Sequence, residues 1–425
     1  MFTRMLTLAS AIALLPCLAS AENWPSWRAD LAGSAASSEK GLPTKWGKDS
    51  NVKWRTELPN RGNSTPIVWG DKVFITQVVE KKDFRTVMCF DRTSGKLQWQ
   101  KGVVFKQEES SHRTNPYCSA SPVTDGERVI ATFASAGVFC YDLDGRLLWQ
   151  RDLGPQVHTW GNASSPLLHK DLCILYHGPG KGAYLIGLDK FTGKTVWKYD
   201  EPAWKIGKRT DGFQGKEDKG IVGSFSTPII VEAEGRHELI MSFPTQLKAF
   251  NPETGSELWH CGGLNPLIYT SPVHHDGVVI AMGGYKGNTI AVKTGGSGDV
   301  SKTHRLWLKV QHNGGIGSGV ARNGHLYYQN TAGIGYCLNI RTGEEMWEER
   351  LQGNSRRTGA WGSPMIAGDT VYFLNQGGDT IIYKADTDFK QMAANATDEQ
   401  SNSSIVASDG DLFIRTHEAL WCIGE

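Results

Sequence analysis

The 425-residue sequence lacks an excess of charge of either sign, with 45 Lys and Arg residues against 44 Asp and Glu residues. A chain without a basic surplus does not have the electrostatic footprint by which proteins bind nucleic acid or an anionic membrane surface. Loss of residues 1–21, argued next, would remove Arg4 and no acidic residue, and would bring the net charge to zero. We therefore expect neither nucleic acid nor a charged membrane as a partner.

Long hydrophobic runs are also scarce. The run Leu6–Leu18 follows Arg4 and precedes an Ala-Ser-Ala motif at 19–21, which is the pattern of a secretory signal peptide. The run is too short for a membrane span, and no later segment is long and apolar enough. We predict cleavage between Ala21 and Glu22, and a mature protein without a membrane span that is periplasmic or secreted.

Gly and Trp, by contrast, are plentiful, with 49 and 15 copies, and both recur at fixed spacing. In residues 187–197, Asp189 can hydrogen-bond the backbone of a tight turn, Gly193 supplies a positive φ, and Trp197 lies on the strand that follows. This pattern predicts a short hairpin with a glycine bulge. The unit recurs in five further places, the last two with a shortened and an enlarged turn: Cys89–Trp99, Ala249–Trp259, Cys337–Trp347, Cys140–Trp149 and Ala291–Trp307.

A second signal, a small residue and Pro before an apolar run, marks where each unit begins. Pro is tolerated at the first residue of a strand, so each copy indicates a first strand. A turn, a second strand, a polar loop and the Trp hairpin follow it. Four antiparallel strands repeated every 40–60 residues or so are typical of a β-propeller. Six copies keep the Pro and two weaker ones do not: Thr65, Ser121, Ser165, Thr227, Ser271 and Ser363, then Ser318 and Ser403-Ser404.

The two ends of the repeat array complement each other. The last copy, residues 403–422, has three strands, and an orphan fourth strand at residues 51–55 precedes the first copy. We predict that this N-terminal strand completes the last blade. The fold is then an all-β, eight-bladed propeller of four-stranded antiparallel blades over residues 46–425, with residues 22–45 wrapping over its surface. Residues 198–223 form an insertion, which we interpret as a surface loop.

Seven tryptophans occupy the fourth strands, and the seventh unit lacks one, with Phe389 or Met392 as substitutes. A Trp on an outer strand can lie flat against the neighbouring blade only where that neighbour offers no bulk, so we assign the small repeat residues to that role. Because the repeat position holds Cys, Gly or Ala, four cysteines there read as small core residues that do not pair with each other: Cys89, Cys140, Cys337 and Cys422. The predicted docking tryptophans are Trp54, Trp99, Trp149, Trp197, Trp259, Trp307 and Trp347.

The pairing of a small residue, Asp, Gly and Trp resembles the tryptophan-docking repeats of pyrroloquinoline-quinone-like β-propellers over nearly all of residues 46–425. The opening Trp24-Pro25-Ser26-Trp27-Arg28 is similar to secreted bacterial members of that superfamily. The resemblance implies one of two functions. Quinoprotein alcohol and sugar dehydrogenases hold the quinone and calcium on the propeller axis, whereas non-enzymatic propellers, such as a lipoprotein of the outer-membrane β-barrel assembly machinery, act as scaffolds.

Calcium-assisted quinoprotein chemistry needs oxygen ligands and an Asp that takes the substrate proton. In the loops that precede the first strands we find one carboxylate, Glu399, without an acidic companion. Adjacent cysteines and the C-x-x-C-H haem pattern are absent, and His274-His275 has no further metal ligands nearby. We therefore predict no catalytic residue, no metal site and no resident cofactor, with pyrroloquinoline quinone and calcium kept as the alternative.

The same loops supply a polar and aromatic rim around the expected axis, which suits a sugar or a planar ligand. We expect a monomeric binding or scaffolding module whose partner is an envelope protein or a small polar ligand. A quinone-dependent dehydrogenase and a carbohydrate-binding propeller are the alternatives. The predicted rim residues are Arg61, Asn63, Asn115, Tyr117, His158, Trp160, Asn162, Tyr269, His312, Asn313, Trp361 and Asn402.

Overall fold

The computed structural model describes residues 22–425 except 205, 207–208, 210–220 and 313. The predicted signal peptide, the rim residue Asn313 and most of the insertion at 198–223 lie outside the described residues.

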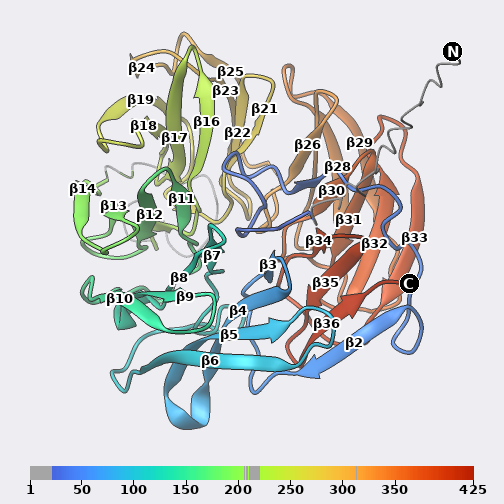
Figure 1. Cartoon of the computed structure of the whole chain (residues 1–425). Coiled ribbons are helices and arrows are strands. Elements are labelled where there is room, and N and C mark those ends of the chain that lie inside the picture. The colour runs from blue at the N-terminus through green and yellow to red at the C-terminus, as the bar shows by residue number, and fades with distance from the viewer. Residues whose placement is uncertain (1–21, 205, 207–208, 210–220, 313) are drawn as a thin grey trace, which may run out of the picture.

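Eight antiparallel sheets stand in a ring around a central axis (Figure 1), as predicted. Blades 1 to 3 comprise, from the axis outward, β3 (Ile67–Trp69), β4 (Lys72–Val79), β5 (Phe84–Asp91), β6 (Leu97–Val104); β7 (Val123–Thr124), β8 (Arg128–Thr132), β9 (Val138–Asp142), β10 (Leu147–Arg151); and β11 (Leu167–His169), β12 (Leu172–His177), β13 (Tyr184–Asp189), β14 (Thr195–Asp200). Blades 4 to 6 comprise β16 (Ile229–Ala233), β17 (Arg236–Phe243), β18 (Gln246–Phe250), β19 (Glu257–Gly262); β21 (Val273–His275), β22 (Val278–Met282), β23 (Thr289–Lys293), β25 (Arg305–Lys309); and β26 (Val320–Arg322), β27 (His325–Gln329), β28 (Ile334–Asn339), β29 (Glu345–Arg350).

Blade 7 comprises β30 (Met365–Ala367), β31 (Thr370–Leu374), β32 (Asp379–Lys384) and β33 (Gln391–Ala396), and blade 8 comprises β34 (Val406–Ser408), β35 (Asp411–Arg415), β36 (Ala419–Ile423) and β2 (Val52–Glu57). The shorter elements are β1 (Ala36–Ser37), β15 (Gly223–Ser224), β20 (Leu267–Ile268), β24 (Gly298–Asp299), and the 3₁₀ turns η1 (Glu80–Lys82) and η2 (Ala134–Ala136).

The chain ends close the ring. β2 pairs antiparallel with β36, with Val52 opposite Ile423 and Glu57 opposite Ala419. The predicted closure of the last blade by the N-terminal strand is confirmed.

The repeat turn has the predicted chemistry. Asp189 accepts hydrogen bonds from the backbone N–H of Phe191 and Thr192 and from the Thr192 hydroxyl. The Thr192 hydroxyl and the backbone donors lower the pKa of Asp189, although slight burial opposes them. Gly193 has a φ of 70°, and the pairing of β13 with β14 shifts register between Gly187 and Leu188. This is the glycine bulge that the sequence predicts.

The outer-strand tryptophans reach the following blade. In six of the seven, the indole Nε1–H donates to a backbone carbonyl there at 2.7–3.0 Å: Trp54 to Arg92, Trp99 to Leu143, Trp149 to Lys190, Trp197 to Pro252, Trp307 to Ile340 and Trp347 to Asp386. Trp259 instead donates to the buried Glu238 carboxylate of its own blade at 3.0 Å. The turn of blade 5 after Trp259 is enlarged, and β24 within it pairs with β19.

The assignment of the small repeat residue to the neighbouring blade is wrong. Gly187 pairs with Trp197 across one blade, and a Cβ at Gly187 would lie 2.5 Å from that indole. The surface that receives the Trp is the turn glycine of the next blade, because a Cβ at Gly255 would lie 2.4 Å from Trp197. The indole of Trp197 therefore lies between two positions without bulk, one in its own blade and one in the next. Turn glycines of the next blade likewise meet Trp54, Trp99, Trp149 and Trp307.

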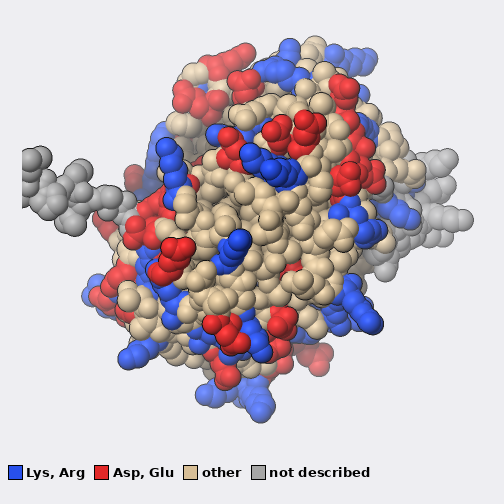
Figure 2. Space-filling model, turned by 90° about the vertical axis from the view of Figure 1, so that its right-hand side faces the viewer, with Lys and Arg blue, Asp and Glu red and all other residues tan. Residues whose placement is uncertain are grey.

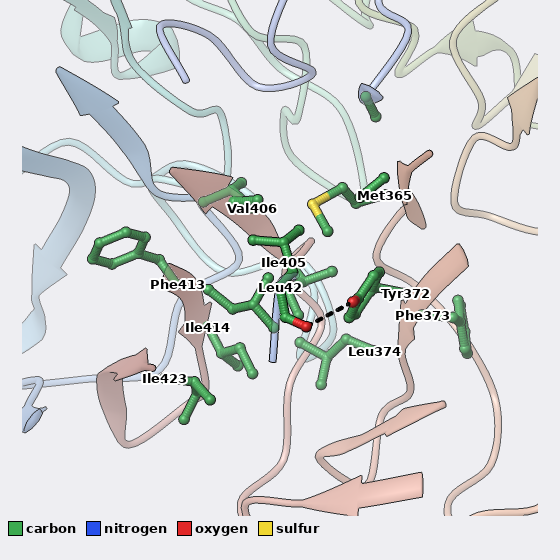
Figure 3. Close-up of a cluster of buried hydrophobic side chains, with 14 of the residues drawn as sticks. Leu42, Met365, Tyr372, Phe373, Leu374, Ile405, Val406, Phe413, Ile414 and Ile423 are labelled. Carbon is green, nitrogen blue, oxygen red and sulfur yellow. Dashed lines mark hydrogen bonds between the residues drawn. The ribbon is translucent and has the colours of Figure 1, made fainter. Parts of the chain in front are cut away.

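Blade 7 has Ala393 where other blades have Trp, opposite Ile382. Phe389 packs on Trp347, with ring centroids 4.9 Å apart, whereas Met392 is 45% exposed and fills nothing. On the other side of this blade, toward blade 8, Leu42 lies in a buried cluster with Tyr372 and Ile405, and its carbonyl accepts the Tyr372 hydroxyl at 3.5 Å (Figure 3). The N-terminal segment therefore contributes core where the repeat is incomplete.

Residues 22–37 cross the middle of the ring (Figure 1, dark blue). Trp24 exchanges backbone hydrogen bonds with Val68, Pro25 accepts from Thr124, and Leu31 accepts from Ile230. β1 then pairs in parallel with β30. These partners lie on first strands, so the segment ties blades 1, 2, 4 and 7 together.

The seven described cysteines are buried and free, so the expectation that the four repeat cysteines do not pair with each other is confirmed. No helix in the described part of the chain combines the length and apolar character that a membrane crossing requires. On the side formed by the last blades, acidic and basic residues are interspersed around a broad uncharged area (Figure 2).

Candidate functional site

A closed ring of hydroxyl groups surrounds the propeller axis. At each of the eight strand starts, the backbone N–H donates to the Ser or Thr hydroxyl of the next blade. The donors and acceptors run Thr65 to Ser121, Ser165, Thr227, Ser271, Ser318, Ser363, Ser404 and back to Thr65, at 2.8–3.3 Å. The sequence pattern placed these residues at strand starts and missed the ring. The available signal was that all eight small residues carry a hydroxyl.

The ring forms the wall of an axial cavity of about 350 Å³. Seven of the eight ring residues line it, with Ser271 the exception. Each hydroxyl that accepts a backbone N–H still has its own hydrogen to donate. Among the described residues, no Lys, Arg, Asp or Glu lines the cavity, and the imidazole of His112 is the one basic group in its lining.

The end of the cavity opposite the rim is built by the N-terminal segment. Trp27 lines the cavity, and the adjacent Arg28 is buried. The Arg28 guanidinium donates to the carbonyls of Gly33 at 2.6 Å, Ser318 at 3.2 Å and Gly319 at 2.5 Å. Burial lowers the Arg28 pKa to about 10, so the side chain stays cationic at neutral pH. Arg28 thus locks the segment to blade 6 and holds Trp27 in place.

The opposite end carries a row of stacked aromatic rings. Trp160 and Tyr269 stack with centroids 6.2 Å apart, and Tyr269 stacks on Phe225 at 6.0 Å with an interplanar angle of 4°. Trp361 and Tyr285 complete the aromatic part of the lining. Sequence reasoning missed Phe225, although it lies two residues before the ring residue Thr227, as Tyr269 and Trp361 lie before theirs. It also missed Tyr285, which lies outside the loops that enter the first strands.

Asparagines hold the rim loops together. Asn115 donates to the carbonyls of Trp160 at 2.7 Å and Asn162 at 3.2 Å, and Asn63 donates to Thr114 at 2.8 Å. These bonds use the amide N–H groups for structure. The Oδ1 atom of Asn63 is buried without a hydrogen-bond partner among the described residues.

The structure brings half of the twelve predicted rim residues to the cavity: Asn63, Asn115, Trp160, Tyr269, Trp361 and Asn402. Tyr117 and Asn162 line a separate cavity of about 20 Å³ instead, and Arg61 is exposed and lines neither. Asn313 lies outside the described residues.

The two predicted rim histidines do not line the cavity. His158 is buried behind it, edge-on to Phe225 at 5.3 Å, and burial lowers its pKa. His312 hydrogen-bonds the Tyr328 hydroxyl at 3.0 Å and the Thr289 hydroxyl at 3.1 Å, which directs it into the interface of blades 5 and 6. Burial lowers the pKa of His312 to about 4.

The lining does not fit pyrroloquinoline quinone with calcium. That cofactor is a tricarboxylate, and calcium sites in proteins usually include carboxylate ligands, yet the described lining offers no Lys, no Arg and no carboxylate. Glu399, the one carboxylate in the entering loops, forms an ion pair with Arg55 at 2.6 Å and accepts from Trp421 Nε1 at 3.1 Å. It is committed to blade 8 and lies outside the cavity.

Comparison with known proteins places this geometry in context. A family model described as outer membrane protein assembly factor BamB matches three overlapping stretches, residues 31–162, 83–349 and 182–424. No curated protein matches the chain. The structure of BamB from Moraxella catarrhalis is similar, with a TM-score of 0.58, 15% identity, and coverage of 87% of this chain and 96% of that one.

Two dehydrogenase structures are similar as well. A europium-containing methanol dehydrogenase has a TM-score of 0.67 at 11% identity, and the match covers 92% of this chain and 89% of the dehydrogenase chain. A quinohemoprotein alcohol dehydrogenase from Comamonas testosteroni has a TM-score of 0.68 at 12% identity, covering 95% of this chain and 81% of its own. The fold occurs in dehydrogenases and in an assembly factor, so the fold alone does not decide the function.

Proposed function

Because the chain belongs to the PQQ-like β-propeller family described as outer membrane protein assembly factor BamB, we propose that it is an extracytoplasmic binding module whose axial cavity takes a small, neutral, sugar-like ligand. The observation that carries the proposal is the cavity lined by stacked aromatic rings and Ser and Thr residues, without Lys, Arg, Asp or Glu among its described residues. Its volume of about 350 Å³ falls within the usual size of small-molecule sites, about 300–1,000 Å³.

Each part of the lining matches one need of a carbohydrate. The apolar face of a pyranose packs on flat aromatic rings such as Trp160 and Trp361. Sugar hydroxyls need both donors and acceptors, and a Ser or Thr hydroxyl can serve as either. An anionic ligand would find no Lys or Arg side chain in the described lining to offset its desolvation cost.

Calorimetric titration of the mature protein with neutral mono- and disaccharides tests the proposal. We expect binding that Trp361→Ala and Tyr269→Ala weaken at least tenfold. Phe191→Ala is the matched control, because Phe191 is an exposed aromatic on blade 3 away from the cavity. Dye reduction by the protein with pyrroloquinoline quinone, calcium and an alcohol would contradict the proposal, as would tight binding of the quinone itself.

Protein scaffolding is the second candidate, favoured by the family description and by the similarity to BamB from Moraxella catarrhalis. Scaffolding would be favoured over sugar binding if none of a panel of neutral sugars bound and a defined envelope protein crosslinked to the propeller in cells.

A further inference from the structure

Three potential metal ligands meet between blades 3 and 4, away from the axial cavity. His169 ends β11, His237 lies on β17, and Glu253 stands in the turn between β18 and β19. One ligand atom from each residue lies within 4.8 Å of the other two. All three stand at the ends of the blades opposite the rim, and none of them lines the cavity.

The geometry is close to that of a tetrahedral site. The His169 Nε2 atom lies 3.4 Å from the Glu253 Oε1 atom, and the two imidazole centroids are 4.9 Å apart. Zinc with ligand bonds of about 2.0–2.1 Å places neighbouring ligand atoms about 3.3 Å apart. The first pair already has this separation. His237 is exposed and can rotate to shorten the remaining distances.

We propose that His169, His237 and Glu253 bind one zinc ion, which clamps blade 3 to blade 4. His169 is held in place by burial, with its side chain 4% exposed, while the other two ligands face solvent. A fourth position is left for water, as is common in sites with three protein ligands. Two nitrogen ligands out of three favour zinc over calcium or magnesium, which take oxygen ligands.

A neighbouring cation already pairs with one of the three ligands. Lys170 forms an ion pair with the same Oε1 atom of Glu253, so its ammonium group competes with a metal ion for this carboxylate.

Zinc binding must therefore displace Lys170. The Lys170 side chain is 58% exposed and can move into water at little cost. The site also adjoins a blade-docking contact, because Trp197 donates to the carbonyl of Pro252, the residue before Glu253. A metal ion here would reinforce the same interface that the indole holds.

The test uses the mature chain without a histidine tag. Titration with zinc should show one site per chain and raise the thermal midpoint, and cobalt should give the visible absorption of a tetrahedral site. His237→Gln should weaken zinc binding at least tenfold and abolish the shift in the midpoint. His260→Gln is the matched control, because His260 also faces a glutamate, Glu257 at 2.8 Å, but is not part of the three-ligand group.

A second variant gives a gain that a purely structural role would not produce. Lys170→Gln removes the competing cation and should tighten zinc binding at least threefold. The proposal is overturned if zinc binds equally well to wild type and His237→Gln, if Lys170→Gln weakens binding, or if zinc leaves the midpoint unchanged. Calcium or magnesium binding at the same affinity would equally count against it.

Discussion

The contact between Trp197 and Gly255 allows a quantitative test of blade docking. Gly255 has a φ of 69°, and a Cβ added there would lie 2.4 Å from the indole of Trp197. Gly255→Ala therefore requires a left-handed backbone at an Ala and a shift of the indole by about 1 Å to reach ordinary contact distance. The indole is 7% exposed, so the shift loosens a buried contact.

The magnitude follows from three parts. A left-handed Ala costs about 1–2 kcal/mol. Loss of the 2.9 Å bond from Trp197 Nε1 to Pro252 costs about 1 kcal/mol. Exposure of about 50 Å² of indole costs about 1 kcal/mol at about 25 cal/mol per Å². We expect Gly255→Ala to lower the free energy of unfolding by about 3–4 kcal/mol.

Gly235→Ala is the matched control. Gly235 lies in the same blade with a φ of 77°, but nothing stands within 4 Å of an added Cβ. Only the backbone cost applies there, so we expect a loss of about 1–2 kcal/mol. Urea unfolding followed by circular dichroism measures both variants against wild type. Equal losses for the two variants would refute the idea that docking of the indole on the turn glycine stabilises the propeller.

Two further predictions concern the hydroxyl ring and acid stability. Ser363→Ala should cost about 1–3 kcal/mol in urea unfolding, because the backbone N–H of Ser318 loses its acceptor at 2.9 Å, while Ser363→Thr should stay close to wild type. An Ala variant as stable as the Thr variant would contradict this role. Burial lowers the pKa of His177 to about 4 in the folded chain. Between pH 6.5 and 4 the unfolded chain therefore binds a proton that the folded chain does not, and the free energy of unfolding decreases as the pH falls. His177 should therefore account for about 2 kcal/mol of the loss between pH 7 and pH 5, and His177→Phe should remove that share of the pH dependence.

The architecture could be predicted because its determinants are local and repeated. Asp189, Gly193 and Trp197 specify a bulged hairpin within eleven residues, and copies of that unit imply copies of one blade. The closure of the ring could also be predicted, because the last unit has only three strands and an additional strand without a unit of its own precedes the first unit. The role of Gly187 was misassigned because spacing along the chain does not show which Trp a small residue faces. It can face the Trp of its own blade or the Trp of the neighbouring blade.

The candidate site was less predictable, since loop position does not fix side-chain direction. His312 enters a rim loop but turns into a blade interface, where the hydroxyls of Thr289 and Tyr328 satisfy its ring nitrogens. Phe225 joins the aromatic row from the loop that enters blade 4, two residues before the strand-start residue Thr227. Trp27 reaches the cavity from a segment with no periodic pattern, because Arg28 fastens it to carbonyls about 290 residues away in sequence.

By itself, the sequence determined the number of blades, the strand order and the position of each docking indole, since these depend on turns and pairings within about fifty residues. Only the tertiary structure decided which residues line the axial cavity and which residues meet between neighbouring blades. Eight hydroxyls become one ring, and His169, His237 and Glu253 become one group of ligands, because closing the propeller brings together residues that no local spacing relates.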